Sequence, residues 1–125
     1  MAIDVLVVDD EEDIRELIAG ILEDEGYSPR TAGDSDAVMA ALQERLPSLV
    51  VLDIWLQGSK LDGLEILSEL KTLHPDLPVI IISGHGNVET AIAAIRKGAY
   101  DFIEKPLSSD KLLLTAARSW VITVD

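Results

Sequence analysis

The stretch IDVLVV, residues 3–8, is a short and mainly apolar run rich in β-branched residues, and two aspartates follow it directly. Two more runs have the same character, LVVL at 49–52 and VIII at 79–82. Continuous runs of this length are typical of strands that are buried on both faces, as in a parallel sheet. Weaker strand candidates lie at 27–32 and 100–103. We therefore expect five strands.

Helical patterns follow each strand candidate. Apolar residues three and four positions apart mark five stripes, and these are Ile14, Leu17, Ile18, Ile21 and Leu22; Val38, Leu42 and Leu46; Leu64 to Leu73; Val88, Ala91, Ile92 and Ile95; and Leu112, Leu113 and Ala116 to about Ser119. Ser35, Asn87 and either Ser108 or Ser109 are expected to cap the starts of three of these helices, because their side-chain oxygens can accept from the first turn.

Strand and helix candidates alternate five times, which favours an α/β fold with helices on both faces of a parallel sheet. Right-handed crossover connections leave few topologies for such a chain. The commonest of this size is the flavodoxin-like, doubly wound (βα)5 arrangement with strand order 2-1-3-4-5. We expect residues 1–119 to form one domain and residues 120–125 to be a C-terminal tail or a truncated linker.

Composition excludes several classes of protein. The 125 residues include 10 Lys+Arg and 23 Asp+Glu, a net charge of −13, so this domain should bind neither nucleic acid nor an anionic membrane surface. Cysteine is absent, which excludes disulfides and thiolate metal sites. The first residues lack a basic segment, and their apolar run ends at Val8, too early for a signal peptide or a membrane span. We expect a soluble cytoplasmic protein.

Polar side chains stand where the candidate strands end, and ligands of open parallel sheets bind beyond those ends. They are Asp9 and Asp10, Asp53, Ser83 and Lys105. Two carboxylates about 5 Å apart repel by roughly 3 kcal/mol at an effective dielectric near 20, so the cluster needs a proton or a cation. Oxygen ligands without cysteine or a well-placed histidine indicate Mg²⁺ or Ca²⁺, and the small number of ligands favours Mg²⁺, which Mn²⁺ could replace.

A carboxylate beside Mg²⁺, with a lysine and a hydroxyl nearby, can accept a phosphoryl group. Asp53 is the candidate nucleophile, which would form an acyl phosphate. Mg²⁺ and Lys105 would stabilise charge on the transferring oxygens, and the Ser83 hydroxyl would bond to another of them. The strand ends thus predict a phosphoacceptor site.

Five stretches of the chain resemble the receiver domains of two-component response regulators: VLVVDDEEDIRELI, VVLDIW, DGLEIL, VIIISGHG and GAYDFIEKP. They are spread over the whole chain. The resemblance implies a role for each of seven residues, namely Mg²⁺ ligation by Asp9, Asp10, Asp53 and the backbone carbonyl of Trp55, phosphorylation of Asp53, phosphate binding by Lys105, and a conformational switch through Ser83 and Phe102. It also implies a cis peptide bond between Lys105 and Pro106.

The stretches LDIWLQGSKLDGLEIL and AYDFIEKP look like the NtrX-type branch of the NtrC-like transcriptional regulators. This resemblance implies a sensor histidine kinase as phosphodonor, a homodimer on the face of the fourth helix, fifth strand and fifth helix, and control of transcription by the full-length protein. It implies a signalling domain rather than an enzyme, although one that assists its own phosphorylation and dephosphorylation. One departure is the loop 57–61, which brings Asp62 and Gly63 two residues later than is usual.

Three other functions stay open at this point. A haloacid dehalogenase-type phosphatase would need an acid two residues after the nucleophile, where this chain has Trp55. A flavodoxin-like cofactor binder would need a Ser/Thr/Gly phosphate loop after the first strand, where this chain has DDEED at 9–13. A receiver that acts as an interaction module and is never phosphorylated would carry the same residues.

Overall fold

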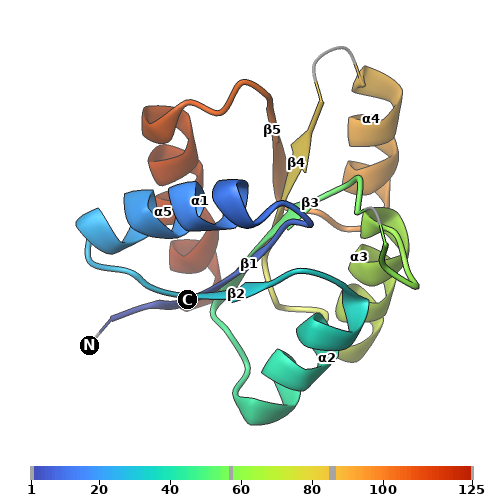
Figure 1. The fold of residues 1–125 in the computed structure, drawn as a ribbon, viewed down its shortest axis with the longest axis horizontal. Coiled ribbons are helices and arrows are strands. Elements are labelled where there is room, and N and C mark those ends of the chain that lie inside the picture. Colours follow the sequence, from blue (N-terminus) through green and yellow to red (C-terminus); the bar gives the residue numbers. More distant parts are fainter. Residues whose placement is uncertain (1, 57, 85–86, 125) are drawn as a thin grey trace.

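The computed structural model describes residues 2–56, 58–84 and 87–124, with side chains described as far as Ser119. Strands and helices alternate along the whole chain (Figure 1), and their bounds are β1 Asp4–Val8, α1 Glu12–Asp24, β2 Ser28–Ala32, α2 Ser35–Glu44, β3 Leu49–Asp53, α3 Gly63–Leu73, β4 Val79–Ser83, α4 Val88–Arg96, β5 Asp101–Glu104 and α5 Ser109–Val124. The strands form one parallel sheet in the order β2-β1-β3-β4-β5. The predicted α/β fold and strand order are confirmed.

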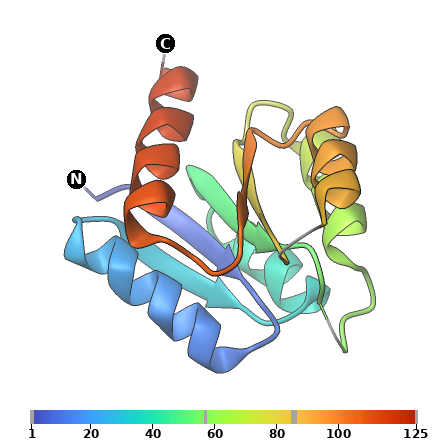
Figure 2. The same ribbon diagram turned by 90° about the horizontal axis from the view of Figure 1, so that it is seen from above.

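The sheet separates two apolar cores. Alternate residues of each central strand point to opposite faces, so Val5 and Val7 of β1 pack under α1 and α5, whereas Leu6 and Val8 pack under α2, α3 and α4. Figure 2 shows α1 and α5 on one side of the sheet and α3 and α4 on the other. Every residue of β3 and β4 is buried, as the continuous apolar runs predicted.

Several of the predicted helix stripes are partly wrong, and in the second and third of them the last residues, Leu46 and Leu73, are exposed. In α4, the buried residues are Ala91 and Ala94, and the larger side chains of Val88, Ile92 and Ile95 are exposed. In α1, Leu17 is 53% exposed although its stripe neighbours pack on the sheet. In α4 the two small alanines are buried against the domain. In both helices, other apolar side chains lie on the outer surface.

The C-terminal helix is longer than the sequence predicts. The apolar pattern predicted that this helix ends near Ser119, but α5 continues to Val124. Its start matches the prediction, because the Ser108 hydroxyl accepts from the Lys111 N–H at 3.4 Å. The domain bounds at 1–119 and 120–125 stay a prediction. The predicted cis peptide between Lys105 and Pro106 is present.

The start of α2 also differs from the prediction. Asp34 is the N-cap, with its carboxylate accepting from the Ala37 N–H at 2.8 Å. Ser35 is instead buried and binds the long β3–α3 loop. Its N–H donates to the Ser59 hydroxyl at 2.9 Å, and its own hydroxyl accepts from the Leu61 N–H at 3.4 Å. The long loop is therefore docked on the first turn of α2.

Gly63 lies where the β3–α3 loop ends and α3 begins, close to the end of β3. Its N–H donates to the Ile54 carbonyl at 3.1 Å. A Cβ at this position would lie 2.4 Å from the Ile54 Cα and 2.6 Å from the Asp53 carbonyl oxygen. Because these are backbone atoms, only glycine lets α3 begin against the end of β3.

We expect Gly63→Ala to destabilise the protein by about 1–3 kcal/mol, the usual cost of overpacking. Gly20→Ala is the matched control, because Gly20 lies inside α1 with no atom near its added Cβ and should gain about 0.5–1 kcal/mol. Urea unfolding of both variants measures the difference. Equal stability of Gly63→Ala and the wild type would show that α3 can begin elsewhere.

Candidate functional site

The register of the sheet brings two of the predicted site residues side by side. Val8 of β1 pairs with Leu52 of β3, and the next residues along these parallel strands are Asp9 and Asp53. Both carboxylates are buried at the carboxyl edge of the sheet. Carboxylate oxygens of Asp9, Asp10 and Asp53 all lie within 4.8 Å of one another. The structure thus joins the three acids that the strand ends predicted.

Asp53 accepts from two donors. The Lys105 Nζ lies 3.0 Å from Oδ2, and the Trp55 N–H donates to Oδ1 at 3.0 Å. The backbone of Trp55 is therefore next to the carboxylate, while its indole is exposed. Ligation of a metal by the Trp55 carbonyl stays a prediction.

Asp9 is a buried acid with one oxygen that has no hydrogen-bond partner. Its Oδ1 accepts from the Glu11 N–H at 2.9 Å, but its Oδ2 is buried without a hydrogen-bond partner. Burial, together with the neighbouring Asp53, raises the pKa of Asp9 to about 7, although the Glu11 N–H and Lys105 act in the opposite direction. The cluster carries more negative charge than its surroundings compensate.

Lys105 is held at the site by its backbone as well as its side chain. Its N–H donates to the Ser83 carbonyl at 2.8 Å, which continues the pairing of β5 with β4. Burial lowers the pKa of Lys105, but the hydrogen bond and charge of Asp53, with smaller contributions from Asp9 and Glu11, outweigh it and raise this pKa. The amine is accordingly a fixed positive charge.

The two predicted switch residues lie on neighbouring strands. Ser83 ends β4 and is buried, and its hydroxyl is the second buried side-chain atom, among the described residues, that lacks a hydrogen-bond partner. Phe102 lies on β5, half-buried against the core under α3 and α4. A buried hydroxyl without a partner is costly unless something binds it.

These features fit a hard divalent cation. The donors are all oxygens, three carboxylates converge, and the buried Asp9 Oδ2 has no proton donor of its own. Mg²⁺ binds through one or two carboxylates and shares its remaining positions with water and phosphate oxygens. The three carboxylates therefore fit a magnesium site in their chemistry, and the complete ligand set stays a prediction.

Some residues at the site were not predicted from the sequence. Arg15 of α1 donates from Nη1 to the Asp9 carbonyl at 2.8 Å, and its guanidinium lies against Gly33. The sequence does contain one signal, because Arg15 is the only basic residue among positions 1–29. Gly63 belongs to the stretch DGLEIL, to which the resemblance assigns no role at the site.

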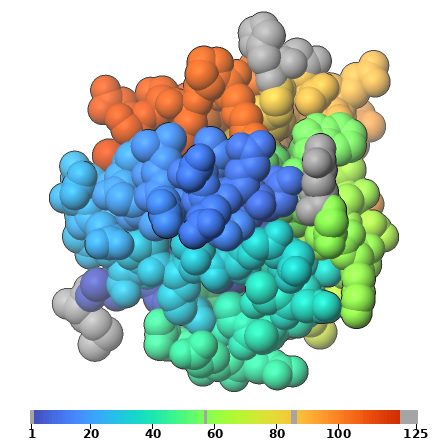
Figure 3. All heavy atoms as spheres, in the orientation of Figure 1, coloured from blue at the N-terminus to red at the C-terminus, as the bar shows by residue number. Residues whose placement is uncertain are grey.

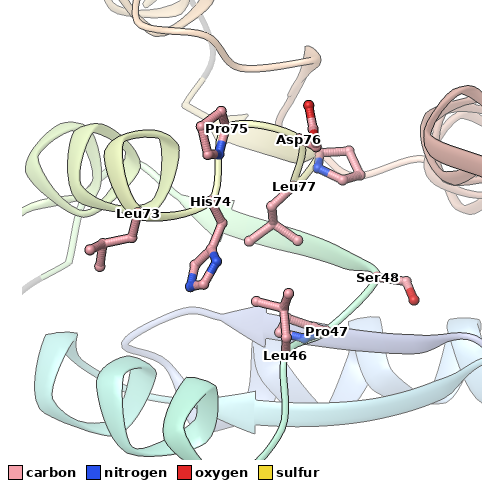
Figure 4. A pocket seen from close by; sticks show the side chains of 9 residues that line it. Leu46, Pro47, Ser48, Leu73, His74, Pro75, Asp76 and Leu77 are labelled. Carbon is pink, nitrogen blue, oxygen red and sulfur yellow. The ribbon is translucent and has the colours of Figure 1, made fainter.

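A hollow at the opposite edge of the sheet lies apart from this site. It is formed where the connections into β3 and β4 approach each other, and Leu46, His74 and Leu77 face it (Figure 4). Its remaining lining residues contain no member of the acidic cluster. It accordingly takes no part in the chemistry of the strand ends.

Within the part of the chain that the structure describes, no helix combines the length and the hydropathy needed to cross a bilayer.

The fold and site define the class of protein. Residues 5–117 match the family described as "Response regulator receiver domain", and the chain belongs to this family. A receiver domain is a signalling domain of response regulators, and phosphorylation-activated two-component function is consistent with this family.

The particular relatives are NtrX-type regulators, as the sequence motifs implied. The chain is 61% identical over 119 residues to the nitrogen assimilation regulatory protein NtrX of Azorhizobium caulinodans, covering 95% of this chain and 26% of that protein. It is 64% identical to the crystal structure of the receiver domain of NtrX from Brucella abortus, with a TM-score of 0.92 and coverage of 94% and 98% of the two chains.

A third comparison concerns assembly. The solution structure of the beryllofluoride-activated NtrC4 receiver domain dimer is 42% identical, with a TM-score of 0.87 over 96% of this chain and 98% of that one. The chain described here spans about a quarter of the length of the curated relatives it matches.

The raised pKa of Asp9 predicts how stability depends on pH. The folded protein binds this proton more tightly than the unfolded chain does, because the pKa is about 7 when folded and 3.8 ordinarily. The free energy of unfolding of the metal-free protein should therefore fall as pH rises from about 4 to about 7. Asp9→Asn removes this titration and should be more stable than the wild type at pH 8.

Urea unfolding in EDTA at pH 5 and pH 8 measures both effects. Asp13→Asn is the control, because it removes one carboxylate at an exposed position in the first turn of α1, outside the acidic cluster. If Asp9→Asn and Asp13→Asn declined equally between the two pH values, Asp9 would not be the group responsible.

Proposed function

We propose that Asp53 accepts a phosphoryl group from the phosphohistidine of a sensor histidine kinase in a Mg²⁺-dependent reaction. The observation that carries this proposal is the position of Asp53, a buried carboxylate in contact with Lys105 and clustered with two further acids. The family of the chain supports the same reaction. Phosphorylation would then change an output surface of the domain.

Asp9, Asp10, Asp53 and the carbonyl of Trp55 would hold the Mg²⁺, and Mn²⁺ could replace it. When bound, the ion would supply positive charge to the oxygens of the transferring phosphoryl group. The Asp9 Oδ2 supports this assignment. It is buried without a hydrogen-bond partner, which costs free energy unless a cation or a donor binds it.

In the transfer step, a carboxylate oxygen of Asp53 attacks the phosphorus, and an O–P bond forms. The P–N bond to the donor histidine breaks, its electron pair stays on the imidazole nitrogen, and that nitrogen takes up a proton. Lys105 pairs with the charge on the phosphoryl oxygens. In dephosphorylation, water attacks the phosphorus, the O–P bond to Asp53 breaks, and inorganic phosphate leaves. The domain assists both steps by holding these groups in place.

Ser83 and Phe102 would transmit the change. The Ser83 hydroxyl lacks a partner and stands at the end of the strand next to β3, so it can donate to a phosphoryl oxygen on Asp53. Phe102 lies in the strand on the other side of β4 and is only half-buried. Movement of Ser83 toward the phosphoryl group would let Phe102 repack, which biases an equilibrium between two conformations.

The output surface that we propose is the face of α4, β5 and α5, used for homodimerisation. Val88, Ile92 and Ile95 lie one helical turn apart and leave an apolar stripe on the outside of α4, the helix at the right of Figure 1. Exposed apolar stripes of this kind mark interaction sites. In the longer cytoplasmic protein to which this domain would belong, the dimer would control transcription.

Incubation with Mg²⁺ and acetyl phosphate should add one phosphoryl group, about 80 Da, to the intact mass. The gain should require Mg²⁺ and disappear in Asp53→Ala. Asp36→Asn, which changes an exposed acid on α2, should be phosphorylated like the wild type. If neither acetyl phosphate nor a cognate kinase changed the mass, the domain would be a phosphorylation-independent interaction module.

Phosphorylation should increase the dimer fraction, and Ile92→Glu should prevent this by placing a charge in the α4 stripe. Leu17→Glu is the matched control, because Leu17 is a similarly exposed apolar residue on α1, on the other side of the sheet. Sedimentation velocity with and without acetyl phosphate measures the dimer fraction. Dimerisation of Ile92→Glu at the wild-type level would place the interface elsewhere.

A further inference from the structure

Arg15 contacts the backbone between the two acids that follow β1. Its Nη1 donates to the Asp9 carbonyl at 2.8 Å, and this oxygen belongs to the peptide group that joins Asp9 to Asp10. On the other side of Asp9, the N–H donates to the Ala32 carbonyl at 3.2 Å. Both peptide groups of Asp9 are thus held by hydrogen bonds, one from the helix α1 and one from the strand β2.

Gly33 leaves the space that the guanidinium occupies. A Cβ at Gly33 would lie 3.0 Å from Arg15 Nη1 and 3.5 Å from Cζ, so the flat guanidinium lies against the glycine. The backbone of Gly33 is not in the left-handed region, since the positive-φ glycines among the described residues are Gly26, Gly58 and Gly98. A Cβ here would press on the end of the Arg15 side chain, so the effect of this glycine is on space and not on backbone conformation.

We propose that Arg15 is a positioning residue for the magnesium site: it fixes the Asp9–Asp10 peptide, and Gly33 provides the surface against which its guanidinium is held. The inference rests on the proposed magnesium site. A shift of this peptide would carry the Cα atoms of both acids, and with them both carboxylates, because the peptide joins these two atoms. Arg15 itself points at the carbonyl and ligates nothing, so it acts through the two acids.

Electrostatics alone would make the opposite prediction. Arg15 is a positive charge beside the Asp9 carbonyl, at the edge of the acidic cluster, and positive charge disfavours cation binding. If Arg15 contributed only its charge, its replacement by a neutral residue would strengthen Mg²⁺ binding. If it orients the Asp9–Asp10 peptide, the same replacement weakens binding. The sign of the change therefore separates positioning from simple charge.

Isothermal titration calorimetry of the wild type and the variants with MgCl₂ tests the proposal. Arg15→Gln should weaken Mg²⁺ binding roughly 10-fold, the usual size of such indirect effects on metal sites. Arg15→Lys should lose less, since an amine can still donate to the carbonyl. Melting of the metal-free proteins checks that each variant is folded.

Gly33→Ala provides a second test that leaves Arg15 and its charge in place. Its Cβ would push the guanidinium away by a few tenths of an ångström, so Mg²⁺ binding should weaken in the same direction as in Arg15→Gln and by less. In the Arg15→Gln background the same change should have no effect on Mg²⁺ binding, because the group it displaces is gone. If the two substitutions weakened Mg²⁺ binding independently, for example by each destabilising the fold, their effects on binding would instead add.

The outcomes distinguish this inference from the proposed function. Wild-type protein that bound no Mg²⁺ would overturn both. Wild-type binding that was unchanged or strengthened in Arg15→Gln would overturn the positioning role and leave the magnesium site intact. Weaker binding in Arg15→Gln, with Gly33→Ala coupled to it, is the result that we expect.

Discussion

The pairing of β1 with β3 places the carboxylates of Asp9 and Asp53 next to each other, and most features of the carboxyl edge compensate for that proximity. Lys105 binds one oxygen of Asp53, and the N–H groups of Trp55 and Glu11 bind one oxygen of each acid. These contacts leave Asp9 Oδ2 without a donor, so the compensation is incomplete. An edge with unbalanced negative charge is a suitable receptor for a cation and, through it, for a phosphoryl group.

The sheet could be predicted from the sequence because its central strands are apolar without interruption, and such runs have few alternatives. The faces of the helices could be predicted less well. In α4 the hydrophobic pattern indicated the right helix but the wrong face, because Ala91 and Ala94 are small enough to lie against the sheet. The larger residues Val88, Ile92 and Ile95 then face outward. Hydrophobicity alone does not distinguish a face that packs on the domain from one that can receive a partner.

The acids, the serine and the lysine of the site could be predicted because each stands where a strand ends, and parallel strands end at one edge. The supporting contacts of Arg15, Gly33 and Ser35 could not, because they depend on how connections approach one another in space. Figure 3 shows α1, in blue, across one side of the molecule, with the segments that follow β2 beside it. Residues 33–35 contain none of the predicted ligands, yet they contact both Arg15 and the loop after Asp53.

The docking of the β3–α3 loop on Ser35 has a consequence for the exchange of segments between receivers. Ser35 is buried, and both of its hydrogen bonds go to Ser59 and Leu61 in the lengthened part of the loop. A graft that shortened this loop by two residues would leave the buried serine without those partners. Chimaeras that keep α2 from this protein must therefore also keep this loop. The two segments have to be exchanged together, although β3 separates them in the sequence.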